Sequence, residues 1–298
     1  MLVFVAVIWQ GIGTAMIGQW VPTRLATLTT FFAFFFATIV SLTIVRVRTV
    51  ADRSAARPLP LGLAILLNLA TAGAFVSFYL AVTMIPATAA TVTDVGIGPV
   101  LVVLVLFFQR QVTSRSLVQP VLVFSAAVCV VIVILSEVEE ALPAELYGDG
   151  LSVFLGLLLS LLAGICAVGV LFLSKHLAAR NYDSLQVASV RFYLAWLLCG
   201  MLAFVDLSRN PTDLSDILHS AVLAVLCITV PILLLQAGVM IASPLLSSLA
   251  LALLPAVVLA AEIALGLQVS FLLVATVALM VLLSLAGVLP LQRVPRSA

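Results

Sequence analysis

The sequence predicts an all-α membrane protein in which ten transmembrane helices form two inverted five-helix repeats. Three observations lead to this prediction: an apolar composition, ten long apolar runs, and a repeat that relates the two halves of the chain. Of the 298 residues, 64% are hydrophobic and 8% are charged, whereas soluble proteins average about 25% charged residues. A bilayer solvates apolar side chains, so it removes the need for a polar surface that this chain cannot supply.

The ten apolar runs each have about the 20 residues that a helix needs to cross a bilayer. They cover residues 2–21, 27–45, 60–84, 87–108, 117–136, 151–173, 184–205, 217–241, 244–264 and 270–289. Barrel strands would be about ten residues long and would alternate in polarity, and these runs do neither. No basic region precedes the first run, so we expect a membrane helix there and not a signal peptide.

Two pairs of helices must join through almost no loop. Pro86 separates the third run from the fourth, and Ser243-Pro244 separates the eighth from the ninth. The Ser243 hydroxyl can cap the helix that follows, and Pro244 suits the first turn of that helix. We therefore expect tight turns at both junctions.

Basic and acidic residues fall on opposite sides of the predicted membrane. The N-terminal side has ten basic residues: Arg46, Arg48, Arg53, Arg57, Arg110, Arg115, Lys175, Arg180, Arg293 and Arg296. The other side has two, Arg24 and Arg209, and it holds the acidic loops 137–150 and 206–216. Because Lys and Arg accumulate in cytoplasmic loops, both termini are predicted in the cytoplasm of a bacterial inner membrane.

A shift of 156 residues aligns the first half of the chain with the second. Nine pairs of identical residues fall between 81–121 and 237–277, among them Pro99 with Pro255. We predict a five-helix repeat at 1–136, an acidic external loop at 137–150, an inverted repeat at 151–289 and a cytoplasmic tail at 290–298. Five crossings per repeat force the second repeat to insert upside down, an arrangement typical of secondary transporters.

Glycines and prolines predict interruptions within two of these helices. Gly96, Gly98 and Pro99 lie inside the fourth run, and Pro255 lies inside the ninth. A proline within a helix frees a backbone carbonyl and kinks the helix. A free carbonyl at membrane depth is tolerated where it is buried in protein or lines a cavity. The broken helices are therefore candidates for the substrate region.

Several of these residues resemble a known family. They are Trp9-Gln10-Gly11, the junction 78–90, Pro99, Arg191, Pro255 and Gly287. On them the chain resembles the drug/metabolite transporter superfamily, in particular its EamA-type ten-helix members. The resemblance implies two inverted repeats around a central cavity and transport of small metabolites, often export of amino acids. The chain departs from the pattern where Gln109-Arg110-Gln111 and Gly266-Leu267-Gln268 lack the glutamate of a Gly-Glu pair.

Three ionisable residues fall inside the predicted spans, where a charge costs about 3 kcal/mol and marks a functional candidate. Asp94 could bind a proton or a substrate amine, or it could be a structural carboxylate that caps a broken helix or pairs with a neighbouring polar group. Arg191 could bind a substrate carboxylate or a backbone carbonyl, or extend its side chain to the interface. Glu262 lies near the outer end of the ninth helix and could reach the interface.

Polar and aromatic residues within the spans are further candidates for the cavity. They are Trp9, Gln10, Asn68, Tyr79, Gln236, Ser247 and Ser248. Since exposure of the Gln10 and Asn68 side chains to lipid is unfavourable, we expect these two residues to face the bundle. There they either line a cavity or join helices through hydrogen bonds.

The predicted function is secondary transport of small organic solutes, with export of amino acids or related metabolites by alternating access. Two alternatives remain: a membrane-embedded binding or assembly protein without a transport cycle, and a multidrug or other-metabolite permease of the same fold. No enzyme motif is present, and the cysteines lack metal-site spacing, so neither a cofactor nor a metal is expected. The expected partners are the lipid bilayer and a small-molecule substrate, not nucleic acid. Proton coupling and the oligomeric state, including a monomer, stay open.

Overall fold

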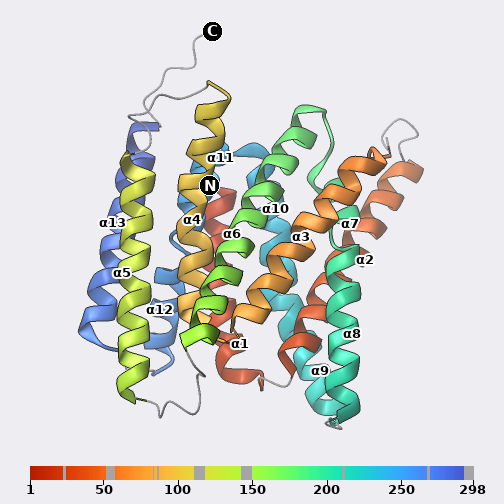
Figure 1. The fold of residues 1–298 in the computed structure, drawn as a ribbon. Coiled ribbons are helices and arrows are strands. Elements are labelled where there is room, and N and C mark those ends of the chain that lie inside the picture. The colour runs from red at the N-terminus through yellow and green to blue at the C-terminus, as the bar shows by residue number, and fades with distance from the viewer. Residues whose placement is uncertain are drawn as a thin grey trace. The chain divides into compact units, whose positions relative to one another are not determined.

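The computed structural model describes residues 1–22, 25–51, 58–82, 84–85, 87–110, 118–141, 150–209, 212–266 and 269–291. These residues form helices and no strands (Figure 1). The elements are α1 (Leu2–Trp20), α2 (Ala26–Ala51), α3 (Leu61–Val82), α4 (Ala87–Phe108), α5 (Val118–Ala141), α6 (Gly150–Ala179), α7 (Ser184–Arg191), α8 (Tyr193–Arg209), α9 (Leu214–Leu223), a π-helix (Ala224–Thr229), α10 (Val230–Ile241), α11 (Pro244–Leu251), α12 (Leu254–Ala264) and α13 (Phe271–Leu291).

In the described part of the chain, 8 helical segments are long and apolar enough to cross a membrane. They are Leu2–Trp20, Ala26–Val50, Leu61–Val82, Thr88–Phe108, Gly150–Ala179, Ser184–Arg209, Leu214–Ile241 and Pro244–Ala264. Two shorter apolar helical segments, Pro120–Ser136 and Phe271–Ala286, lie at the other two predicted runs. The protein is thus an all-α, multi-pass membrane protein, while ten crossings and inverted repeats remain predictions.

The chain divides into two compact units, each built from two separate stretches. Unit 1 contains Met1–Val76 and Gly169–Ala242, and unit 2 contains Ser77–Val168 and Ser243–Ala298. The boundaries fall within α3 and α6, so each of these helices contributes to both units. Each unit takes segments from both halves of the sequence. This division does not test the predicted repeats, because a repeat relates sequences and need not be a compact unit.

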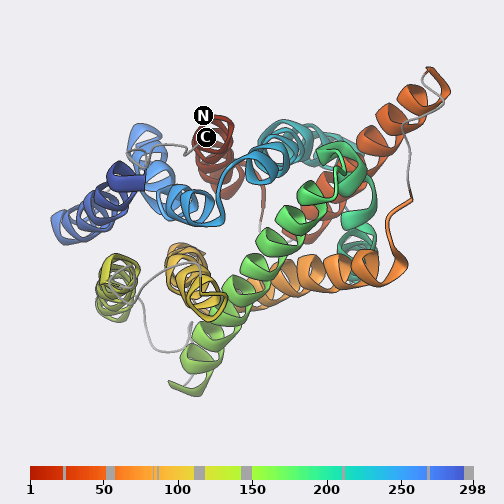
Figure 2. The ribbon, with the colours of Figure 1, turned by 90° about the horizontal axis from the view of Figure 1, so that it is seen from above.

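Close helix packing in unit 1 depends on glycines. A Cβ atom at Gly13 of α1 would lie 2.5 Å from the main-chain oxygen of Cys227 in the π-helix. At Gly238 of α10 it would lie 2.7 Å from a methyl of Val3. Small residues let membrane helices approach closely and gain van der Waals contact. In the same unit, α7 contacts α2 and also the first part of α3, helices that Figure 2 shows from above.

Unit 2 uses the same device around α4. A Cβ atom at Gly96 would lie 2.5 Å from that of Ala127 on α5, and one at Gly164 of α6 would lie 2.5 Å from the main-chain oxygen of Asp94. Helices α5 and α13 also lie side by side (Figure 1). The turn of α4 that carries Asp94 is therefore pressed directly against α6.

Three predicted runs are interrupted or irregular within the membrane length. The seventh divides into α7 and α8 at Phe192, and the eighth contains the π-helix between α9 and α10. The ninth divides between Leu251 and Leu254, with Pro255 in the first turn of α12. An interruption at Pro255 was predicted, whereas sequence gave no signal at Phe192.

The interruption predicted at Gly96, Gly98 and Pro99 is absent, because α4 runs unbroken from Ala87 to Phe108. That prediction was wrong. The glycines serve packing instead, since Gly96 abuts α5 and a Cβ atom at Gly98 would lie 3.9 Å from that of Ser248 on α11. A single proline removes one hydrogen bond, and a membrane helix tolerates that loss without ending.

The predicted turn before α11 is confirmed. The Ser243 hydroxyl accepts a hydrogen bond from the Leu246 backbone N–H at 3.2 Å, and Pro244 is the first residue of the helix. At the other junction, the backbone N–H groups of Met84 and Ile85 both donate to the Ala81 carbonyl at 2.9 Å. Pro86 lies outside the described residues.

Candidate functional site

Arg191 is the centre of a polar cluster inside unit 1. Its Nε donates to the Thr71 hydroxyl on α3 at 3.2 Å, and its Nη1 donates to the side-chain oxygen of Gln236 on α10. The Gln236 amide nitrogen donates in turn to the Ser174 hydroxyl on α6 at 3.3 Å. We call Thr71, Ser174, Arg191 and Gln236 the Arg191 cluster. Thr71, Ser174 and Gln236 are fully buried. Side chains from two neighbouring helices, α3 and α10, bond the guanidinium, and Ser174 on α6 supports Gln236.

All the acceptors in this cluster are neutral. No carboxylate within the described ranges forms an ion pair with Arg191. The guanidinium carbon lies 4.9 Å from the centre of the Phe192 ring, a distance that permits a cation–π contact. Hydrogen bonds and a ring face stabilise the cation, but they leave its charge without an anion.

Asn68 closes the gap between α7 and α8. Its Nδ2 donates to the Val190 carbonyl at 2.6 Å, and its Oδ1 accepts from the Leu194 backbone N–H at 3.1 Å. Val190 and Leu194 are four residues apart, the spacing of bonded partners in an unbroken α-helix. The amide therefore takes the place of one helical hydrogen bond. Phe192, at the break, has φ −103° and ψ 2°.

The polar contacts of Asn68 assign it a supporting role at Arg191, the last residue of α7. The same Nδ2 also donates to the Ala64 carbonyl of its own helix at 2.9 Å. Both ends of the amide are engaged, and each bond fixes one side of the interruption. Asn68 thus joins α3 to α7 and α8 through hydrogen bonds, as expected for one of the two sequence-based alternatives.

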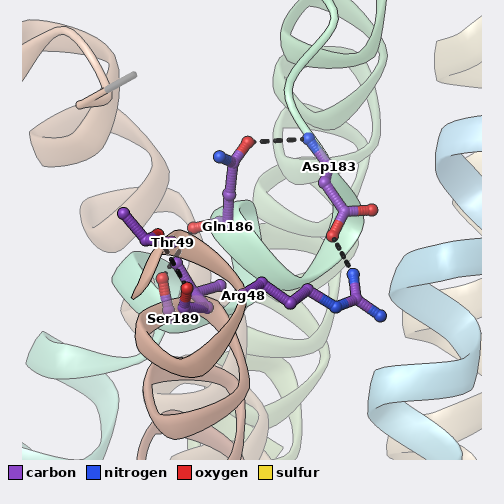
Figure 3. A network of polar contacts seen from close by, with 6 residues as sticks. Arg48, Thr49, Asp183, Gln186 and Ser189 are labelled. Carbon is purple, nitrogen blue, oxygen red and sulfur yellow. Dashed lines mark hydrogen bonds and ion pairs between the residues drawn. The ribbon is translucent and has the colours of Figure 1, made fainter. Parts of the chain in front are cut away.

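The start of α7 is anchored by the contacts shown in Figure 3. The Asp183 backbone N–H donates to the Gln186 side-chain oxygen at 3.0 Å, and the Asp183 carboxylate pairs with Arg48 of α2 at 3.2 Å. The Arg48 side chain is 62% exposed and the Asp183 side chain is 50% exposed. Exposed ion pairs contribute little free energy. We therefore expect the Arg48–Asp183 pair to add little to the stability of the fold.

Trp9 and Gln10 lie on α1, next to the irregular part of the eighth run. The Trp9 indole N–H donates to the Leu226 carbonyl at 2.9 Å. Leu226 belongs to the π-helix, in which backbone groups bond five residues apart and not four. The side-chain oxygen of Gln10 is buried without a hydrogen-bond donor among the described residues. Trp9 therefore joins two helices, whereas Gln10 keeps an unused acceptor.

Asp94 lies in unit 2, within the unbroken part of α4. The side chain is partly buried, and no group in the described part of the chain donates a hydrogen bond to its carboxylate or pairs with it. Helix α6 packs against its backbone at Gly164. A role as the cap of a broken helix is excluded, because α4 is not broken there.

The remaining candidates differ in their surroundings. Ser247 on α11 is fully buried, and its hydroxyl has no partner within the described residues. Ser248 donates to the Leu245 carbonyl of its own helix at 3.0 Å. Glu262 is partly buried on α12. Tyr79 lies on α3, and its side chain is outside the described part of the structure.

Three polar residues at or near the Arg191 cluster were not predicted as site residues: Thr71, Ser174 and Lys175. Thr71 follows Asn68 by three residues on one helical face, which was an available signal. Ser174 and Lys175 were predicted in a loop, but α6 continues to Ala179. There the Lys175 ammonium donates to the Met240 carbonyl at 2.9 Å. The helix therefore continues beyond the predicted apolar run, and the prediction of a loop at Ser174 and Lys175 was wrong.

Comparison with known proteins supports the fold. No protein-family model matches the chain, and no curated protein matches it. One matching solved structure, described only as "Crystal structure of protein", has a TM-score of 0.68 and is 18% identical. The match covers 100% of this chain and 98% of the other. At this identity, the similarity shows that the two chains share a fold.

Proposed function

We propose that the protein is a secondary transporter of small organic solutes that exports amino acids or related metabolites by alternating access. The observation that supports this most is the interruption of the membrane segment 184–209 beside Arg191. Charges at membrane depth and discontinuous helices both mark substrate sites in transporters. An arginine at the end of a broken helix, pre-positioned by neutral side chains, combines the two features.

The proposal includes ten crossings arranged as two inverted repeats, as in EamA-type members of the drug/metabolite transporter superfamily. The 156-residue sequence offset supports the duplication, and the distribution of Lys and Arg supports cytoplasmic termini in a bacterial inner membrane. Asp94 adds a carboxylate without a partner in the described ranges, which a proton or a substrate amine could occupy. Coupling to a proton gradient would act through this group.

The test is flux through the purified protein in liposomes. Vesicles loaded with a mixture of amino acids are diluted into solute-free buffer, with and without an imposed proton gradient, and efflux is measured by mass spectrometry. We expect efflux of at least one amino acid above that of protein-free vesicles. Efflux at background for amino acids and related metabolites, under every gradient, contradicts the proposal.

A second function, a membrane-embedded binding or assembly protein without a transport cycle, is favoured by one observation. The Arg191 cluster and Asn68 tie α3, α6, α7, α8 and α10 together through hydrogen bonds, as a static bundle would. Such a protein would bind a solute without moving it. Solute binding together with background efflux would therefore select this function over transport.

A further inference from the structure

Arg191 carries a charge that the described part of the structure does not balance. Arg48, in contrast, forms an ion pair with Asp183, and both side chains are exposed, where water solvates them. Arg191 is partly buried on a membrane-spanning segment, and the atoms that bind it are a hydroxyl and an amide oxygen. Because an uncompensated charge is unfavourable away from water, this guanidinium is a site for an external anion.

Some donors of the guanidinium are used within the protein, and others are not. Nε and one donor of Nη1 are used by Thr71 and Gln236. Nη2 donates to no group among the residues that the structure describes. The guanidinium is planar and has five donors, so the Nη1 and Nη2 groups can together hold both oxygens of one carboxylate.

The bonds that Arg191 already makes also fix the orientation of its unused donors. Gln236 is itself held by Ser174, and Asn68 fixes the helix break that follows Arg191. These bonds hold the arginine in place before any ligand arrives, which lowers the entropy that binding must lose. The cluster therefore has the properties of a prepared receptor: a fixed cation, neutral supports and unused donors.

A single cation of this kind favours a monovalent anion. Lys175, the other long cationic side chain on the helices that form the cluster, donates to the Met240 carbonyl. A phosphate would call for more positive charge than one guanidinium supplies, whereas a carboxylate matches its charge and its two-point geometry.

We infer that Arg191 binds the carboxylate group of the transported solute through its Nη1–Nη2 edge, with Asn68, Thr71 and Gln236 as positioning residues. The inference rests on the proposed function and sharpens it, since it requires an anionic group and excludes simple amines. The solute supplies the counter-charge that the protein lacks.

The experiment measures thermal unfolding of the purified full-length chain in detergent. L-amino acids and short monocarboxylates are each compared with their own carboxamide, which keeps the rest of the molecule and lacks the anionic group. We expect at least one acid to raise Tm while its carboxamide leaves Tm unchanged. Arg191→Gln abolishes this shift. Arg191→Lys weakens Kd by about tenfold, because lysine keeps the charge but loses the two-point contact.

Arg180→Gln is the matched control, since Arg180 is exposed at the end of α6 and lies outside the cluster. It retains the acid-dependent shift. The inference is overturned by equal shifts from acid and carboxamide, by no shift from any acid, or by an unchanged shift in Arg191→Gln. If Arg191→Gln does not fold, the acid and carboxamide comparison and Arg191→Lys still decide.

The inference about binding and the proposal of transport can be contradicted independently of each other. A protein that binds carboxylates through Arg191 but moves none contradicts the proposed function and leaves this inference intact. Transport that does not distinguish an acid from its carboxamide contradicts the inference and leaves transport intact.

Discussion

Unit 1 and unit 2 each hold a charged residue at membrane depth, and the two residues are treated in opposite ways. Arg191 in unit 1 is bonded to Thr71 and Gln236 and stands beside a helix break. Asp94 in unit 2 lies on an unbroken helix and, among the described residues, has no bonded partner. A residue held by neutral groups is pre-positioned, whereas a bare carboxylate is free to exchange a proton or a cation.

The supports differ as well. Around Arg191 they are side-chain hydrogen bonds, which can be rearranged one at a time. Around Asp94 the support is steric, because Gly164 of α6 packs against the backbone of α4. A charged residue within a membrane can therefore be positioned either by polar contacts or by close backbone packing. The following changes test which support matters in each unit.

The largest effect is expected from Gly164→Leu. A Cβ atom at this position would lie 2.5 Å from the Asp94 carbonyl oxygen and 2.4 Å from an Ile97 methyl, so α6 must separate from α4. Overpacking of this kind should lower the free energy of unfolding by about 3 kcal/mol. Thermal unfolding in detergent measures it.

Gly150→Leu is the control for Gly164→Leu. Gly150 begins the same helix and has no heavy atom within 4 Å of a Cβ position. An equal loss of stability in both variants would show that the close packing of Gly164 against the backbone at Asp94 does not stabilise α4.

Asn68→Leu tests the polar support in unit 1. The change removes the bonds to the Val190 carbonyl and the Leu194 N–H and leaves both groups without a partner at the break. Unfolding should become easier by about 2 kcal/mol. Chemical or thermal unfolding measures this loss. Thr14→Val is the control, because the Thr14 hydroxyl bonds only the Gln10 carbonyl of its own helix at an exposed position. A loss no larger than that of the control would contradict the role of Asn68.

Asp94→Asn should separate function from stability. Since no described group pairs with the carboxylate, the free energy of unfolding should change by no more than about 0.5 kcal/mol. Efflux from proteoliposomes should fall by about tenfold or lose its dependence on a proton gradient, because the carboxylate can no longer exchange a proton. Unchanged efflux with an unchanged pH dependence would reduce Asp94 to a structural residue.

The smallest effect is expected from Arg48→Gln. The pair with Asp183 joins two exposed side chains at 3.2 Å. Its loss should change the free energy of unfolding by less than about 1 kcal/mol. Added salt should change the stability of the variant and of the parent protein by nearly the same amount. Arg46→Gln, an exposed change on the same helix, is the control. A larger loss would show that the start of α7 depends on the pair.

Much of the fold could be predicted from the sequence. The positions of the apolar helices, the cap at Ser243 and the interruption at Pro255 follow from run length, capping chemistry and proline geometry. The interruption at Gly96–Pro99 was predicted from the same residue types and was wrong. Glycine indicates either a break or a close approach, and only the neighbouring Ala127 decides between them.

The candidate site was less predictable. Asn68 was predicted to face the bundle, because exposure of its amide to lipid is unfavourable, and Gln236 and Arg191 were named as candidates. Their mutual contacts were not predicted, and neither was the break at Phe192. Nothing in the local sequence around Phe192 resembles a helix stop. The amide that bonds both sides of the break belongs to Asn68 on α3, more than 100 residues away along the chain.

By itself the sequence determined that the chain enters a membrane, where its helices lie and which residues carry charge into the apolar spans. These properties follow from composition and run length, because lipid acts on each segment separately. The tertiary structure alone decided which helices are interrupted, that Arg191 is bonded to two buried polar side chains and that Asp94 has no such partner in the described chain. These properties depend on contacts between segments far apart in sequence, where one methyl group or one amide decides the outcome.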